Sequence, residues 1–138
     1  MSKLTAQQAR EKFMNRKKRM IELDISLPDL EELDGQLGVL ELTAKDIEKA
    51  QKLSKGANGE DDAMAMTAGM IARALVMLDS RERVFTDDDI GYMVENFGLA
   101  ILEPLGTKVA LGSGISENAL EEAKKNLMTT TVSASATS

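Results

Sequence analysis

The longest apolar stretch of the sequence lies within residues 61–78 and predicts a central helix. After two acidic residues, only one Gly, one Thr and one Arg interrupt the apolar side chains. Apolar positions such as Met66 and Met70 recur at steps of three and four, which leaves a narrow polar edge at Thr67 and Arg73. A helix that is apolar nearly all round is buried in a bundle or covered by a second chain. The stretch is short for a membrane span and contains an arginine, which argues against one.

Alternation of apolar and polar residues predicts a small sheet near the N-terminus. Ile21, Leu23 and every second residue to Leu27 are apolar, a period of two that is typical of a half-buried strand over residues 21–27. Residues 37–42 can form a second short strand. We expect the two strands to pair as an antiparallel hairpin.

Further helices are predicted by apolar periodicity and by N-capping residues. Thr5 with Gln8, and Thr43 with Asp46, have the spacing of a capping box. Pro104, together with Gly106, is expected to kink or split one of the helices. A polar, low-complexity tail over residues 128–138 is expected to be disordered. The expected helices span residues 6–20, 44–54, 61–78, 87–97, 99–111 and 117–127.

These elements predict a mainly α fold, a small helical domain with a short N-terminal β-hairpin. We divide the chain into a basic N-terminal helix or arm (residues 1–20), the helical domain (residues 21–127) and the tail. At 138 residues, a single domain is the expectation.

Composition argues against most catalytic and metal chemistry. The chain has no Cys and no His, which removes the commonest general base and the usual zinc ligands. The acidic triplet at residues 87–89 lacks the ligand spacing of a calcium loop, and negative charge in the first turn of a helix explains it. We therefore expect no enzyme activity, no metal and no cofactor.

Charge is unevenly distributed along the chain. Residues 1–20 contain seven Lys or Arg and one acid, whereas the whole chain has a net charge of −6. The run Arg16, Lys17, Lys18 and Arg19 has two main interpretations: a solvated helix end, or a segment that docks to an acidic surface, including that of another copy. Nucleic acid is a third, disfavoured partner, because the acidic body would repel phosphates.

The order of several motifs resembles a known family. Residues 42–46 (LTAKD) open a helix, the Met-rich helix ends in Leu78-Asp79, and residues 83–90 (RVFTDDDI) precede an apolar helix. Residues 121–126 (EEAKKN) lie near the end. Over residues 40–127 this order is similar to the tail assembly chaperones of long-tailed bacteriophages and prophages. The basic N-terminal segment is outside the resemblance.

The resemblance implies a non-enzymatic role in virion assembly. Such chaperones coat the tape-measure protein, help tail-tube protein to polymerise around it in the host bacterial cytoplasm, and are absent from the mature virion. Many are made in two lengths by a programmed frameshift. Lys124, Lys125 and Asn126 match the place of an A-rich slippery run, although they equally suit a charged helix end.

The Met-rich helix has two interpretations. Methionine fills irregular cores, and it also forms adaptable surfaces for partners. Under the second interpretation the candidate contacts to the tape-measure protein are Met64, Met66, Met70 and Met77, followed by Phe97 and Leu99. We expect a homo-oligomer without membrane association. The alternatives are a structural head–tail or neck protein of the virion, and a nucleic-acid-binding regulator that uses the basic arm.

Overall fold

The computed structural model describes residues 3–54 and 62–114 and confirms the mainly α fold. The helix expected over residues 117–127, the tail and the Lys124–Asn126 segment lie outside the described residues. Two short 3-10 helices, η1 (Glu31–Leu33) and η2 (Asp87–Asp89), accompany the α-helices. The five described α-helices are α1 (Ala6–Met14), α2 (Ala44–Leu53), α3 (Ala63–Ala74), α4 (Ile90–Asn96) and α5 (Leu99–Gly112).

The predicted hairpin is present and belongs to a three-stranded antiparallel sheet. Strands β1 (Met20–Glu22), β2 (Leu37–Leu40) and β3 (Leu75–Met77) lie in the order β1-β2-β3. Ile21 is paired with Val39. The first strand is shorter than predicted, because β2 offers only four residues to pair with. The alternation still holds beyond the ladder, since Leu23 and Leu27 are buried while the residues between them are exposed or half-buried.

The predicted end of the central helix was wrong. Helix α3 stops at Ala74, and the apolar residues that follow form β3, paired with β2. An apolar run does not by itself distinguish a buried helix from a buried strand. The distant strand β2 decides the outcome, since Val76 lies opposite Gly38 in the ladder. At Gly38 an added Cβ would lie 2.9 Å from the side chain of Leu78, so this close approach depends on glycine.

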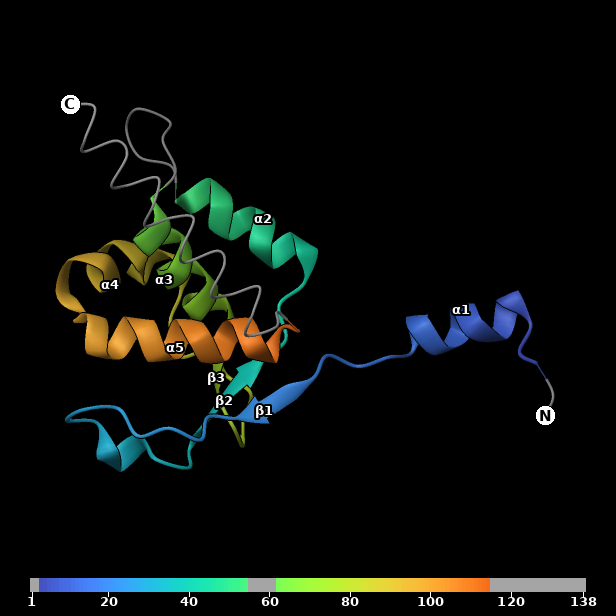
Figure 1. The fold of residues 1–138 in the computed structure, drawn as a ribbon, viewed down its shortest axis with the longest axis horizontal. Helices are drawn as coiled ribbons and strands as arrows, with labels where there is room; N and C mark the ends of the chain where they lie inside the picture. Colours follow the sequence, from blue (N-terminus) through green and yellow to red (C-terminus); the bar gives the residue numbers. More distant parts are fainter. Residues whose placement is uncertain (1–2, 55–61, 115–138) are drawn as a thin grey trace.

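Helix α3 occupies the centre of the body, as its apolar surface predicts, with α2, α4 and α5 packed around it (Figure 1). Small residues allow this close packing. A Cβ added to Gly69 would lie 3.2 Å from the Cβ of Ala50 in α2. The side chains of Ile71, Met93, Leu102 and Leu105 are almost completely buried and form the centre of the core.

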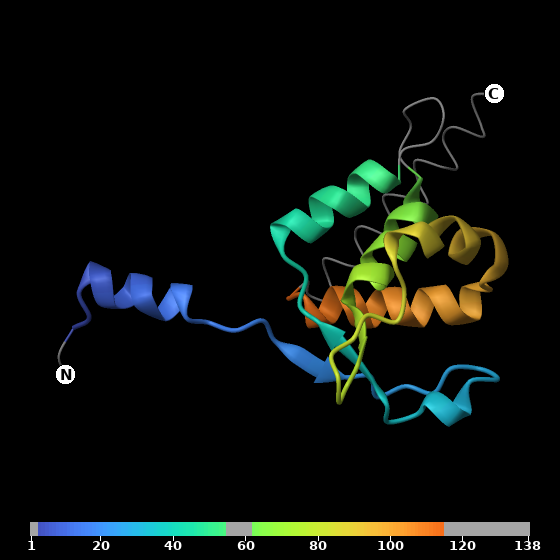
Figure 2. The same ribbon diagram turned by 180° about the vertical axis from the view of Figure 1, so that it is seen from behind.

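Helix α5 runs unbroken past Pro104, so the expected kink or split is wrong (Figure 2). Pro104 is the sixth residue of the helix. The backbone N–H that proline lacks would have donated to the carbonyl of Ala100, which is an exposed residue. Gly106 serves packing, because a Cβ there would lie 2.8 Å from Cγ2 of Thr67. Gly112 ends the helix against the sheet, where a Cβ would lie 3.1 Å from Val39.

No helix in the described part of the chain is both long enough and apolar enough to cross a membrane.

Candidate binding surfaces

The N-terminal arm, residues 3–19, projects from the body as a short helix and a linker (Figure 1). The predicted capping box opens α1: the Thr5 hydroxyl accepts from the Gln8 N–H at 3.2 Å, and the Gln8 side chain accepts from the Thr5 N–H at 2.9 Å. No residue of α1 is buried. Helices of nine residues are marginal in water without tertiary contacts. The arm therefore presents a helix that needs a partner for its stability.

Helix α1 ends at Met14, so the helix predicted over residues 6–20 was too long. The four basic residues lie in a non-helical linker. On a helix, Arg16 and Arg19 would be neighbours of like charge at a spacing of three residues. In the linker, Arg16 instead binds both oxygens of Glu41, at 2.8 and 3.2 Å, and the backbone N–H of Arg19 donates to Glu41 at 3.1 Å.

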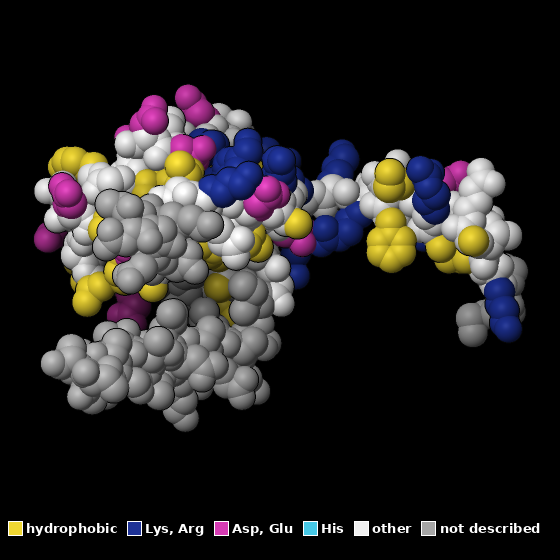
Figure 3. Space-filling model, turned by 90° about the horizontal axis from the view of Figure 1, so that it is seen from above, with side chains coloured by type: hydrophobic (Ala, Val, Ile, Leu, Met, Phe, Trp, Pro, Cys, Tyr) yellow, Lys and Arg dark blue, Asp and Glu magenta, His cyan; other side chains and the backbone are white. Residues whose placement is uncertain are grey.

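The Glu41 contact accounts for part of the predicted basic site. The Arg16 guanidinium and the Arg19 N–H lower the pKa of Glu41, and Glu41 in turn raises the pKa of Arg16. Arg16 thus docks to a carboxylate of its own body. Lys17 and Lys18 remain exposed, and Lys and Arg side chains gather where the arm joins the body (Figure 3).

Apolar side chains stand out from the arm into solvent (Figure 3). Phe13 is 80% exposed, Met14 is 67% exposed and Leu4 is 58% exposed. Three exposed large apolar side chains on one short segment make the arm a candidate contact surface for another molecule.

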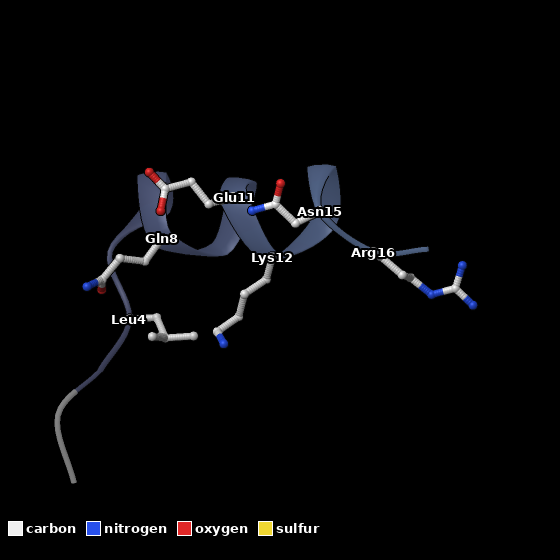
Figure 4. A pocket seen from close by; sticks show the side chains of 6 residues that line it. All are labelled: Leu4, Gln8, Glu11, Lys12, Asn15 and Arg16. Carbon is white, nitrogen blue, oxygen red and sulfur yellow. The ribbon is translucent and has the colours of Figure 1, made fainter. Parts of the chain in front are cut away.

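A hollow of about 570 Å³ follows the arm (Figure 4). All of its lining residues are exposed and come from the arm itself. A hollow bordered by one helix cannot enclose a small molecule, so we interpret it as open surface. Its lining residues are Leu4, Gln8, Glu11, Lys12, Asn15 and Arg16.

A second apolar surface lies where α4 meets α5, and we call it the aromatic corner (Phe85, Tyr92, Phe97 and Leu99). The Phe97 ring contacts Phe85 and Tyr92 edge-on, with centroids 5.7 and 6.2 Å apart. Phe85 and Phe97 also pack against the core, whereas Tyr92 is 65% exposed and Leu99 is 63% exposed. In the corner, Phe85 and Phe97 are held against the core, and Tyr92 and Leu99 are exposed.

Acidic residues are frequent in the segment that contains α4 and the start of α5. Residues 87–103 include five acids and no Lys or Arg. Asp88 and Glu95, on either side of Tyr92, are exposed and form no ion pair within the described residues. Tyr92 was missed as a candidate from the sequence, although an aromatic residue between two acids on a short helix was an available signal.

The structure separates the two groups of residues that were candidates for client contact. Met64, Met70 and Met77 are half-buried and pack against the core, and Met66 is half-buried. Met77 lies in β3, so the four methionines do not share one helical stripe. Packing with the core accounts for most of their surface. Phe97, by contrast, contacts the other two rings of the aromatic corner, and Leu99, two residues later at the start of α5, is exposed.

Arg73, predicted as a polar edge, lies in a charged cluster that joins three elements. Its side chain is only 8% exposed and lies 3.7 Å from both Asp46 and Asp87. Arg83 adds an ion pair to Asp87 at 3.2 Å and donates to the backbone carbonyl of Ala72 at 2.9 Å. These contacts tie α3 to α2 and η2, so we interpret the cluster as structural.

Asp46 is the member of this cluster with a shifted pKa. Burial raises the pKa of Asp46, but hydrogen bonds from the N–H and hydroxyl of Thr43, together with Lys18 and Arg73, outweigh burial, so the pKa lies below its usual value. The bond from the Thr43 N–H to Asp46, at 2.9 Å, is one half of the predicted capping box of α2, and the Asp46 N–H completes the box by donating to the Thr43 hydroxyl at 3.2 Å.

Two members of the acidic triplet, Asp87 and Asp89, are engaged in folding contacts. Asp87 pairs with the two arginines, and Asp89 accepts the backbone N–H of Thr86 at 2.8 Å. Among the described residues, no group of three acidic, His or Cys side chains is placed to hold a metal ion.

Comparison of the chain with protein-family models, with curated proteins and with solved structures finds no match in any of the three.

Proposed function

We propose that this chain is a non-enzymatic tail assembly chaperone that covers apolar helical stripes of the tape-measure protein while tail-tube protein assembles around it. The observation that carries the proposal is the aromatic corner, where Tyr92 and Leu99 are exposed beside a ring anchored in the core. The corner supports binding of an apolar protein surface. The identity of the client rests on the motif order of residues 40–127.

The corner suits a client that is long and repetitive. Covering one large apolar side chain stabilises a complex by about 1.5–3 kcal/mol. Two exposed side chains, Tyr92 and Leu99, therefore give weak binding for one copy, because association also costs translational and rotational freedom. Many copies that line one client, and that also touch one another, bind with higher overall affinity. Weak individual contacts also allow tail-tube subunits to displace the chaperone.

Co-expression with tape-measure segments tests the corner directly. Leu99→Asp places a charge at the exposed edge of the corner, and we expect it to reduce the amount of soluble client captured by about tenfold. Leu53→Asp is the matched control, because Leu53 is also exposed, at 45%, but lies in α2. Equal capture by both variants would place the client elsewhere on the molecule.

The assembly role has a separate test in virus-producing cells. An antibody raised against this chain should detect it in cells during tail assembly and fail to detect it in purified particles. A second, longer band in cells would report the programmed frameshift. Retention in purified particles would contradict the chaperone and favour the structural head–tail or neck protein.

A further inference from the structure

We propose that the N-terminal arm of one copy docks on the aromatic corner of a second copy. This inference rests on the proposed function only because both use the same corner. It adds what covers the corner before a client binds. It concerns the client-free protein, so it can be measured independently of any client.

In the structure, the arm does not cover the corner of its own chain (Figures 1 and 2). The arm joins the body at β1, and the C-terminal end of α5 lies at this strand, because a Cβ on Gly112 would be 3.3 Å from Ile21. The corner contains Leu99, at the opposite end of α5. With 14 residues, this helix spans about 21 Å. The arm also points away from the body in both views (Figures 1 and 2).

Charge complementarity identifies the arm as the occupant. Residues 3–19 contain seven Lys or Arg and one acid, and residues 87–103 contain five acids and no Lys or Arg, but Arg16 and Asp87 are already paired within the chain. On the arm, Arg10 and Lys12 are exposed and unpaired within the described residues. At the corner, Asp88 and Glu95 are likewise exposed and form no ion pair within the described residues. Opposite charges on two free surfaces steer association and fix orientation.

The apolar parts of the two surfaces also correspond. Phe13 lies on the arm between the cations, and Tyr92 lies on the corner between the acids. Phe13 is 80% exposed and Tyr92 is 65% exposed, so each ring has free surface for the other. Edge-to-face aromatic contacts already build the corner, and a further ring extends that arrangement. Docking also gives α1 the tertiary contact that a nine-residue helix requires.

The contact joins different surfaces of the two copies. Each copy therefore keeps one free arm or one free corner after pairing, and further copies can add. Such heterologous contacts form rings when the rotation closes and open chains when it does not. A client helix that binds the corner must displace the neighbouring arm, so the arm keeps apolar surface covered until a client is present.

Sedimentation velocity of the full-length protein tests this arrangement with two variants. Phe13→Asp disables the arm, and Leu99→Asp disables the corner. Wild-type protein should associate as its concentration rises, and each variant alone should remain monomeric at concentrations where wild type associates. An equal mixture of the two variants retains one intact arm and one intact corner, so it should form dimers and nothing larger.

Salt and a control variant complete the experiment. Association of wild type should weaken as salt rises, because the screening length falls from about 10 Å at 0.1 M to about 3 Å at 1 M. Leu53→Asp, in α2, should associate as wild type does. At a concentration where wild type is also monomeric, circular dichroism should show the same helix content in all variants, since every substituted residue is at least 45% exposed.

Three results would overturn the inference: monomeric wild-type protein at every concentration, a variant mixture that stays monomeric, or either variant alone associating as wild type does.

Client capture separates this inference from the proposed function. Phe13→Asp should capture more client than wild type, because its corner is uncovered. If the mixture dimerises but Leu99→Asp captures client normally, the arm contact stands and the client site is elsewhere. If self-association is absent but Leu99→Asp loses client, the client site stands alone.

Discussion

Two guanidinium nitrogens of Arg16 donate to the carboxylate of Glu41, at 2.8 and 3.2 Å, and this contact fixes the direction in which the arm leaves the body. The two residues are 25 positions apart in the sequence. The contact is solvent-exposed, with Arg16 at 55% and Glu41 at 23% side-chain exposure. Exposed ion pairs contribute little to stability. We conclude that this pair sets the orientation of the arm more than it stabilises the fold.

Glu41→Gln should therefore loosen the arm and leave the melting temperature nearly unchanged. The chain has no Cys, so spin labels can be placed at Gln7→Cys in α1 and Lys49→Cys in α2 without removing native thiols. Pulsed dipolar spectroscopy should show a broader distance distribution for Glu41→Gln than for wild type. Glu48→Gln is the control, because its carboxylate pairs with Lys52 within α2. An unchanged distribution in Glu41→Gln would mean that other contacts orient the arm.

Asp46 should make part of the stability dependent on pH. Its pKa is lowered in the folded protein, so the contribution of the carboxylate is complete above the unfolded-state pKa of about 4 and is lost as pH falls through the folded-state pKa. Melting temperatures between pH 7 and pH 2 should fall less steeply for Asp46→Asn than for wild type in the acidic range. At pH 7 the variant should melt lower, because Thr43 loses its carboxylate acceptor. Parallel pH profiles would contradict this assignment.

The surroundings of Gly91 in α4 and of Gly106 in α5 predict opposite effects on stability when each is replaced by alanine. Alanine is favoured over glycine in a helix by about 1 kcal/mol. Gly91→Ala should gain about that amount, because nothing lies within 4 Å of its added Cβ. Gly106→Ala should instead destabilise the protein, because its Cβ would lie 2.8 Å from Cγ2 of Thr67. Overpacking of this kind costs about 1–3 kcal/mol.

Thr67→Ser provides the check on the Gly106 prediction. This substitution removes Cγ2 and keeps the hydroxyl that bonds the carbonyl of Ala63 at 3.0 Å. In a double-mutant cycle measured by urea unfolding, Gly106→Ala should destabilise less in the Thr67→Ser background than in wild type. Equal effects in the two backgrounds would show that α5 shifts to make room.

Much of the helical framework could be predicted from the sequence, because the signals that form it are local. The capping boxes at Thr5 and Thr43 act over three residues and are present as predicted. The period of two over residues 21–27 correctly marked Leu23 and Leu27 as buried. Of the candidate site, Phe97 and Leu99 could be chosen from the sequence as large apolar residues.

The features that sequence reasoning missed depend on contacts between distant residues. Residues Leu75–Met77 form a strand because β2 is available to pair with them. The basic linker is extended because Glu41, far along the chain, binds it. Pro104 is tolerated because it lies near the start of α5, where the backbone N–H that it lacks would have reached the exposed residue Ala100. The aromatic corner exists only once Phe85 and Tyr92 meet Phe97.

The sequence by itself determined where helices begin, which face of each segment is apolar, and that a basic N-terminus precedes an acidic body. Hydrogen bonds and side-chain contacts over three or four residues carry this information. Only the tertiary structure decided that the methionines mostly pack inward while Tyr92 and Leu99 remain exposed. Exposure is a property of how elements cover one another, and no local pattern specifies which apolar face is left uncovered.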